Sequence, residues 1–169
     1  MNLRAGVDLG GTKIQAVVVD DRFTVLGQER RPTPTKGKPA DVAEEIAAAV
    51  RGAAENAEAE ASDLSSIGVG SPGDVDDDNG TVTSARNLPS WEGSFPLAGA
   101  LQDELGPPVS LGNDVNVATM AEASLGAGQP YRSMLGVFWG TGVGGGVVLD
   151  GKLWHGRASA GEILSLIHI

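Results

Sequence analysis

The sequence predicts an α/β protein of two lobes, and three features of the chain support this fold class. A glycine-rich turn lies between two short apolar runs twice, at residues 7–13 and 139–146, as expected of two β-hairpins. An alanine-rich stretch that opens at Asp41 carries apolar residues at helical spacing, as expected of a helix that covers a sheet. Short apolar runs at residues 67–70 and 109–112 predict further buried strands.

The first lobe, expected over residues 1–108, begins with the first hairpin. Strands at 3–7 and 14–19 flank the turn, because both runs are short and the second is rich in β-branched residues. Residues 24–30 are predicted as a third strand. The prolines and the glycine between residues 32 and 39 predict a loop before the helix.

Three segments of the first lobe lie outside these elements. Residues 71–73 follow strand 67–70 as a loop where open α/β sheets commonly bind ligands, although a tight turn is the simpler interpretation. The acidic residues of 74–80 are interpreted as a solvated hairpin loop, because the bidentate Glu of a calcium loop is missing. In the irregular segment that follows, Asn87 and Trp91 suit a sugar, since an amide can bond paired hydroxyls and a ring can cover a C–H face.

The second lobe, expected over residues 109–163, begins with a strand and a helix over 115–125. Four residues of this helix should face the core: Val117, Met120, Ala121 and Leu125. A strand over 133–139, the second glycine-rich turn and a returning strand at 147–149 follow. Residues 164–169 are interpreted as an apolar tail that belongs to neither lobe.

Composition excludes several classes of partner and site. The chain has 169 residues and a net charge of -10, so we expect no nucleic acid and no anionic membrane as partner. It has no cysteine, which excludes disulfides and thiolate metal sites and fits a cytoplasmic location. No signal peptide or membrane span is expected. His155 and His168 have no companion at ligand spacing, so no protein metal site is expected.

The first turn carries the groups that an anion site needs. Gly10 and Gly11 allow backbone N–H groups to approach an anion closely, and Thr12 and Lys13 add a hydroxyl and an ammonium group. Asp8, at the end of the preceding strand, is placed to hold a metal ion and its waters. A purely structural hairpin is the alternative interpretation.

The second turn fits the spacing G-x-G-x-x-G at Gly140, Gly142 and Gly145. A dinucleotide-binding fingerprint requires a helix directly after these glycines, whereas this chain continues as a strand, so that interpretation fails. Two glycine hairpins that face each other could instead hold one nucleotide's phosphates. Asp114, in the first turn of a helix, could accept a proton from an attacking hydroxyl, although a helix cap at Asn113 or Asp114 is the simpler interpretation of this feature alone.

Five motifs together resemble those of the ROK family (repressors, open reading frames, kinases), sugar kinases of the actin/hexokinase-like ATPase superfamily, and among them the bacterial glucokinases. The motifs are residues 8–13, 85–89 with Trp91, 112–116, 140–146 and 150–162. They occur in the family's order over residues 5–163.

The resemblance implies an actin/hexokinase-like (ribonuclease H-like) fold and the ATP-dependent phosphorylation of a hexose, foremost glucose to glucose 6-phosphate. It implies that Asp114 is the general base. The implied sugar-binding residues are Gly73, Asn87, Asn113, Asp114 and Glu162. The implied ligands of ATP phosphates carrying Mg²⁺ are Asp8, Gly10, Gly11, Thr12, Lys13, Gly140, Thr141, Gly142, Gly144 and Gly145. A full-length relative is expected to be a cytoplasmic homo-oligomer.

The chain departs from the family after residue 163. The family continues with Gly-His and a cysteine-rich zinc segment, neither of which follows here, so no zinc site is carried over. We therefore expect a sugar kinase cut within its second lobe, with Val137, Val147 and Leu149 beside an open edge or in an exposed apolar patch. Such a chain should be poorly soluble or self-associating, with little or no kinase activity.

Several functional alternatives stay open within this interpretation. Fructose, mannose or an N-acetylated amino sugar could replace glucose, and polyphosphate could replace ATP. A sugar-sensing repressor of the same family would need a DNA-binding segment ahead of residue 8 and a basic face, which the sequence does not show. A non-catalytic sugar-binding module is the remaining alternative.

Overall fold

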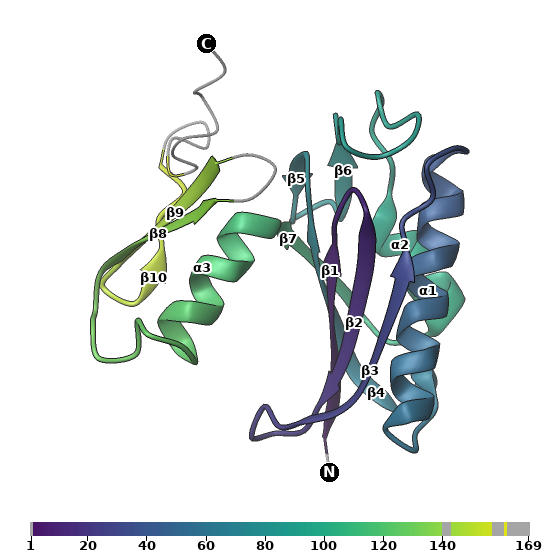
Figure 1. Ribbon diagram of the computed structural model, residues 1–169, viewed down its shortest axis with the longest axis horizontal. Coiled ribbons are helices and arrows are strands. Elements are labelled where there is room, and N and C mark those ends of the chain that lie inside the picture. Colours follow the sequence, from purple (N-terminus) through teal and green to yellow (C-terminus); the bar gives the residue numbers. More distant parts are fainter. Residues whose placement is uncertain (1, 140–142, 157–160, 162–169) are drawn as a thin grey trace. The chain divides into compact units, whose positions relative to one another are not determined.

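The computed structural model describes residues 2–139, 143–156 and 161. The chain divides into two compact units, Met1–Asn113 and Asp114–Ile169 (Figure 1). The first unit is a mixed sheet with two helices, and the second is a small antiparallel sheet with one helix.

The sheet of the first unit has five strands in the order β3-β2-β1-β4-β7. Their bounds are Leu3–Leu9 (β1), Lys13–Val19 (β2), Val25–Pro32 (β3), Leu64–Ser71 (β4) and Val109–Asn113 (β7). β1, β2 and β3 are antiparallel neighbours, as the sequence predicts, while β4 runs parallel to both β1 and β7. β7 therefore completes the first unit's sheet, whereas we expected this strand to begin the second lobe.

Helices α1 (Pro39–Asn56) and α2 (Leu97–Leu105) belong to the first unit, where α1 packs against the sheet (Figure 1). α1 begins two residues before the predicted start, because Pro39 occupies the first helical turn, where a missing N–H does no harm. Asp41 caps this end, since its carboxylate accepts the Lys38 N–H at 2.6 Å. Ile14 and Ile46 have no exposed surface in the core between sheet and helix.

The segment between β4 and α2 forms a small hairpin. β5 (Asp74–Asp76) and β6 (Thr81–Thr83) pair in register, and the acidic turn between them is the solvated loop that the sequence predicts. A short 3-10 helix, η1 (Ala61–Asp63), precedes β4. An antiparallel β-bridge between Val82 and Phe95 links this hairpin to the segment that precedes α2.

The second unit has three antiparallel strands in the order β10-β9-β8, together with helix α3. Their bounds are Asp114–Ser124 (α3), Met134–Trp139 (β8), Val143–Leu149 (β9) and Lys152–Leu153 (β10). α3 packs on the sheet face that carries Gly136 and Gly146, and a Cβ on either glycine would meet the Thr119 side chain. The absence of a side chain at these two positions lets the helix approach the sheet closely.

The predicted buried face of α3 is wrong. Val117 is 46% exposed and Leu125 is 51% exposed, while Asn116 and Thr119 are buried. Met120 is half-buried and Ala121 is exposed. The reason is that the glycines of β8 and β9 admit the polar face of the helix, where the Thr119 hydroxyl is satisfied by the Val115 carbonyl at 2.8 Å.

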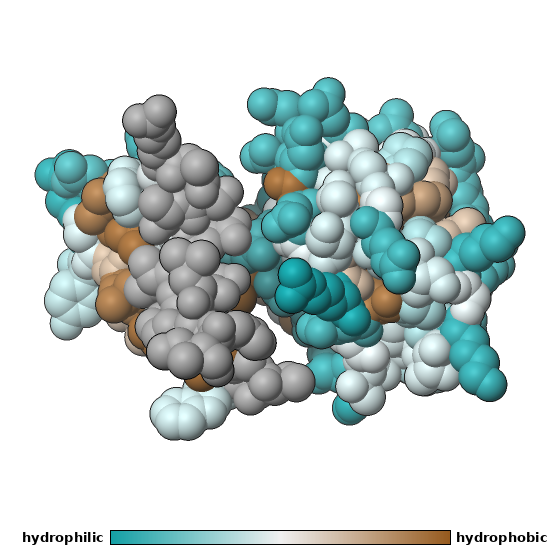
Figure 2. Space-filling view, turned by 90° about the horizontal axis from the view of Figure 1, so that it is seen from above, coloured by the Kyte–Doolittle hydropathy of each residue, from teal (hydrophilic) through white to brown (hydrophobic). Residues whose placement is uncertain are grey.

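The opposite face of this sheet carries exposed apolar side chains, which we call the apolar sheet face: Leu135, Val137, Trp139, Val143 and Leu149. Exposure of Val137 and Leu149 confirms the prediction, whereas Val147 is half-buried. Hydrophobic surface of the second unit is brown in Figure 2. Among the described residues only β9 pairs with β8, and β8 carries neither charge nor proline, unlike the charged edge strand β3.

We predict that the apolar sheet face makes this chain self-associate. Val137→Lys should shift the molar mass measured by light scattering after size exclusion towards that of the monomer, because a charge on this face opposes association. Val117→Lys, at a valine of α3 that is 46% exposed compared with 53% for Val137, is the matched control and should leave the mass unchanged. Equal masses for the two variants and the wild type would contradict the prediction.

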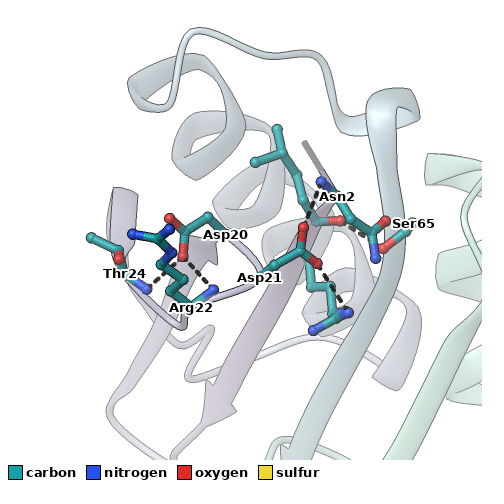
Figure 3. A network of polar contacts seen from close by, with 8 residues as sticks. Asn2, Asp20, Asp21, Arg22, Thr24 and Ser65 are labelled. Carbon is teal, nitrogen blue, oxygen red and sulfur yellow. Dashed lines mark hydrogen bonds and ion pairs between the residues drawn. The ribbon is translucent and has the colours of Figure 1, made fainter.

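The turn between β2 and β3 is organised by Asp20 (Figure 3). Its carboxylate accepts the backbone N–H of Arg22 at 2.8 Å and that of Thr24 at 2.9 Å. These bonds, that of Thr24 first, lower the pKa of Asp20 below its ordinary value of 3.8. Asp21 beside it pairs with Arg4 at 3.4 Å, which ties the turn to β1.

We predict that Asp20→Ala destabilises the chain in a pH-dependent way. Because the folded-state pKa is lowered, the stabilisation is present above pH 3.8 and is lost as the pH falls through the folded-state pKa. The difference in unfolding midpoint between variant and wild type should therefore shrink from pH 6 to about pH 3 in urea titrations. Asp103→Ala, at an exposed acid of α2, is the control, and a difference that grows on acidification would refute the assignment.

Candidate active site

The parallel pairings of the first unit bring three strand ends to one edge of the sheet. Asp8 on β1 lies in register with Gly70 on β4, and Ser71 at the end of β4 lies in register with Asn113 at the end of β7. Ligands of open α/β sheets bind outside the carboxyl ends of parallel strands. This edge is therefore the candidate active site of the first unit.

The first glycine turn occupies this edge between β1 and β2. The Gly10 N–H donates to the Lys13 carbonyl at 2.9 Å, while Gly11 and Thr12 are exposed. Within the described part of the chain, the backbone N–H groups of Gly11 and Thr12 have no hydrogen-bond partner. Two such groups beside a lysine are suited to an anion.

The Asn87 loop lies directly against this turn. A Cβ built on Gly11 would stand 3.0 Å from both the Cβ and the carbonyl oxygen of Asn87. Glycine is thus favoured here by the close approach of two segments rather than by an unusual backbone angle. The structure thus brings together two segments that lie far apart in the sequence. One is the first glycine turn, residues 10–13, which is predicted to bind phosphate and which we call the phosphate turn. The other is the Asn87 loop, which is predicted to bind the sugar.

The loop at residues 71–73 is shaped by its backbone. Ser71 is fully buried, and its hydroxyl donates to the Pro72 carbonyl at 3.0 Å. Gly73 has a φ of +89°, and a Cβ there would stand 2.7 Å from the Thr83 carbonyl oxygen. The glycine is therefore needed for this tight turn at the end of β4.

Trp91 is not available as a platform for a sugar, contrary to the interpretation from the sequence. It is only 2% exposed, its indole N–H donates to the Val82 carbonyl at 3.0 Å, and its ring meets Phe95 edge-on at 5.5 Å. Trp91 instead supports the loop that carries Asn87. Asn87 itself is exposed at the surface of that loop.

Asn113 and Asp114 connect the two units of the chain. Asn113 ends β7 and Asp114 begins α3, and both side chains are half-buried. The Asp114 carboxylate accepts the Val115 N–H at 2.8 Å, so it contributes to capping the helix. A carboxylate at this position also lies at the positive end of the helix dipole, which favours its ionised form.

Four predicted site residues lie outside the described residues: Gly140, Thr141, Gly142 and Glu162. The two remaining predicted site residues of the second turn are described and lie on β9: Gly144, which packs against Val115, and the buried Gly145.

Thr33, to which the sequence patterns assign no role, contacts the first turn through two hydrogen bonds. Its hydroxyl donates to the Gly10 carbonyl at 2.6 Å, and its N–H donates to the Thr12 carbonyl at 3.1 Å. The signal in the sequence is only a threonine between two prolines.

Metal binding by the protein alone has little support in this part of the chain. The described residues contain no group of three or more His, Asp or Glu side chains close enough to hold an ion. Asp8, exposed beside the glycine turn, fits a Mg²⁺ that is held mainly by a ligand's phosphates and by water.

None of the helices in residues 2–139, 143–156 and 161 is long and apolar enough to cross a membrane.

The profile of the ROK family matches residues 4–163. The chain belongs to the ROK family, as its motifs predict. It is 38% identical over 157 residues to a glucokinase of Streptomyces coelicolor, which covers 93% of this chain and 47% of that protein. It is 36% identical over 159 residues to an N-acetyl-D-glucosamine kinase of Vibrio parahaemolyticus, covering 94% of this chain and 50% of that protein.

The structure of the chain is also similar to solved structures of ROK family proteins. A crystal structure of a ROK family glucokinase from Streptomyces griseus, in complex with glucose and AMPPNP, superposes with a TM-score of 0.84 and 36% identity over 99% of this chain and 50% of that one. The predicted actin/hexokinase-like α/β fold is thereby confirmed. The chain spans about half the length of the curated relatives it matches.

We predict that Gly11→Ala strains the contact between the turn and the Asn87 loop. The added methyl group must displace Asn87 by a few tenths of an ångström, and overpacking of this kind costs ~1–3 kcal/mol of unfolding free energy, measurable by urea denaturation. Gly68→Ala on β4 is the matched control, because nothing lies within 4 Å of a Cβ there. Equal stability of the two variants would show that the contact is loose.

Proposed function

We propose that the protein acts as an ATP-dependent hexose kinase whose foremost substrate is glucose, converted to glucose 6-phosphate. The observation that carries the proposal is the convergence of three strand ends on one sheet edge. There the phosphate turn, the 71–73 loop and Asn113 lie together, and Asp114 follows directly in the chain. The named activities of the ROK relatives support it.

The turn of the first unit would hold the terminal phosphates of ATP. Its unpartnered N–H groups at Gly11 and Thr12 and the Lys13 ammonium group supply positive charge where the nucleotide is most negative. The second turn, including Thr141, is proposed to hold the phosphates from the other hairpin. Mg²⁺, bound with ATP and near Asp8, would neutralise charge that develops on the transferred phosphoryl group.

The sugar would be held by the side chains of Asn87, Asn113 and Glu162 and by the 71–73 loop. Asp114 would accept the proton of the attacking sugar hydroxyl as the bond from the hydroxyl oxygen to the γ-phosphorus forms. The bond from that phosphorus to the oxygen of the β-phosphate breaks, and ADP leaves. Because phosphoryl transfer passes through a loose transition state, orienting the hydroxyl matters more than strong basicity.

Three further parts of the proposal follow from charge and family. A net charge of -10 supports the absence of nucleic acid and anionic membrane partners. Cytoplasmic location and homo-oligomeric assembly are proposed from the kinship with ROK kinases. The kinship with an N-acetyl-D-glucosamine kinase makes that amino sugar the second substrate to test.

We predict that Asp114→Asn abolishes most of any glucose-dependent ADP release in a coupled assay. Loss of a general base lowers kcat by about 10²–10⁴-fold, while the KM for glucose changes little because the amide keeps the shape of the side chain. Asp103→Asn, on the exposed surface of α2, is the control and should retain wild-type kcat. Retention of kcat in Asp114→Asn would refute the assigned role.

A binding measurement decides the case in which the wild-type chain shows no turnover. Calorimetric titration with glucose, with and without AMPPNP, should then show saturable heat that depends on the sugar. Glucose binding without turnover would indicate a non-catalytic sugar-binding chain. Absence of glucose binding under both conditions would contradict the proposal.

A further inference from the structure

Thr33 places a buried hydroxyl behind the phosphate turn. It is 4% exposed and lies just after β3, 23 residues along the chain from Gly10, whose carbonyl accepts its hydroxyl at 2.6 Å. The Thr33 N–H donates to the Thr12 carbonyl at 3.1 Å. One residue therefore holds two carbonyl groups of the turn from the same side.

The bond to Gly10 fixes the direction of a neighbouring donor. The Gly10 carbonyl and the Gly11 N–H belong to the same planar trans peptide unit, in which the two groups point in opposite directions. When the carbonyl is held towards Thr33, the Gly11 N–H must point away from it. This is the N–H group that has no hydrogen-bond partner in the described part of the chain.

The Gly10 N–H is the one donor of the glycine pair that already has a partner within the turn. It donates to the Lys13 carbonyl at 2.9 Å and is therefore not available to a ligand. The turn thus separates its groups into an inner set, bonded to Thr33 and to each other, and an outer pair of N–H groups at Gly11 and Thr12. A glycine pair without such a support would lose this order, because glycine restricts its peptide units least.

We propose that Thr33 is a positioning residue for anion binding: its hydroxyl orients the Gly10–Gly11 peptide so that the Gly11 N–H faces a nucleotide phosphate. The inference rests on the proposed function of the turn and assigns to Thr33 no contact with the ligand. Threonine suits this task because its branched side chain is stiff and carries one donor. Valine would have the same shape and would leave the Gly10 carbonyl without that donor.

The test compares Thr33→Val and Thr33→Ser with the wild-type chain, using inorganic tripolyphosphate as the probe and the ¹⁵N–¹H resonances of Gly11 and Thr12 as the readout. Thr33→Val should raise the Kd for tripolyphosphate about fivefold, the effect of losing one hydrogen bond, while Thr33→Ser should stay within about twofold of the wild type. Thr35→Val, an exposed threonine of the same loop, is the matched control and should bind as the wild type does.

A second readout separates positioning from general stabilisation. The ¹⁵N order parameter of Gly11 without any ligand should fall in Thr33→Val and be restored in Thr33→Ser. If Thr33→Val lowers the melting temperature but leaves both the Kd and this order parameter unchanged, the hydroxyl is merely structural and the inference is overturned. If the wild-type resonances do not respond to tripolyphosphate at all, the phosphate role of the turn fails, and the inference fails with it.

Discussion

The candidate site depends on the parallel pairing of β4 with its two neighbours. β4 lies between β1 and β7 in the same direction as both, so the chain leaves all three strands at one edge of the sheet. An antiparallel β4 would have sent Ser71 to the opposite edge from Asp8 and Asn113. The crossover through α1 allows the parallel arrangement, because a parallel pair requires a long connection. The chemistry proposed for the edge is thus a consequence of how the sheet is connected.

Local patterns in the sequence predicted the elements that are set by local physics. The first hairpin follows from two β-branched runs around Gly10 and Gly11, and α1 follows from its apolar spacing and from a start signal within two residues of Pro39. Family motifs then predicted which of these elements carry the site. Both kinds of inference use residues that are close together in the chain.

The parts that the sequence did not predict depend on contacts between distant residues. The role of Thr33 depends on a carbonyl 23 residues away, and the burial of Trp91 depends on where β6 places the Val82 carbonyl. The face that α3 buries is decided by glycines of β8 and β9 that lie opposite Thr119. A hydrophobicity pattern of the helix alone cannot report that its partner strands have glycine at the positions facing Thr119.

The close approach of Gly11 to Asn87 also constrains how such a protein can change over evolutionary time. Any larger residue at position 11 presses on the loop that is proposed to select the sugar, so the two segments cannot diverge independently. Under the proposed function, a change of sugar preference is then expected at exposed positions of the loop such as Arg86 and Glu92, which border an open hollow of ≈ 380 Å³. Descendants of this chain would therefore inherit Gly11 unaltered, together with variable residues around the hollow.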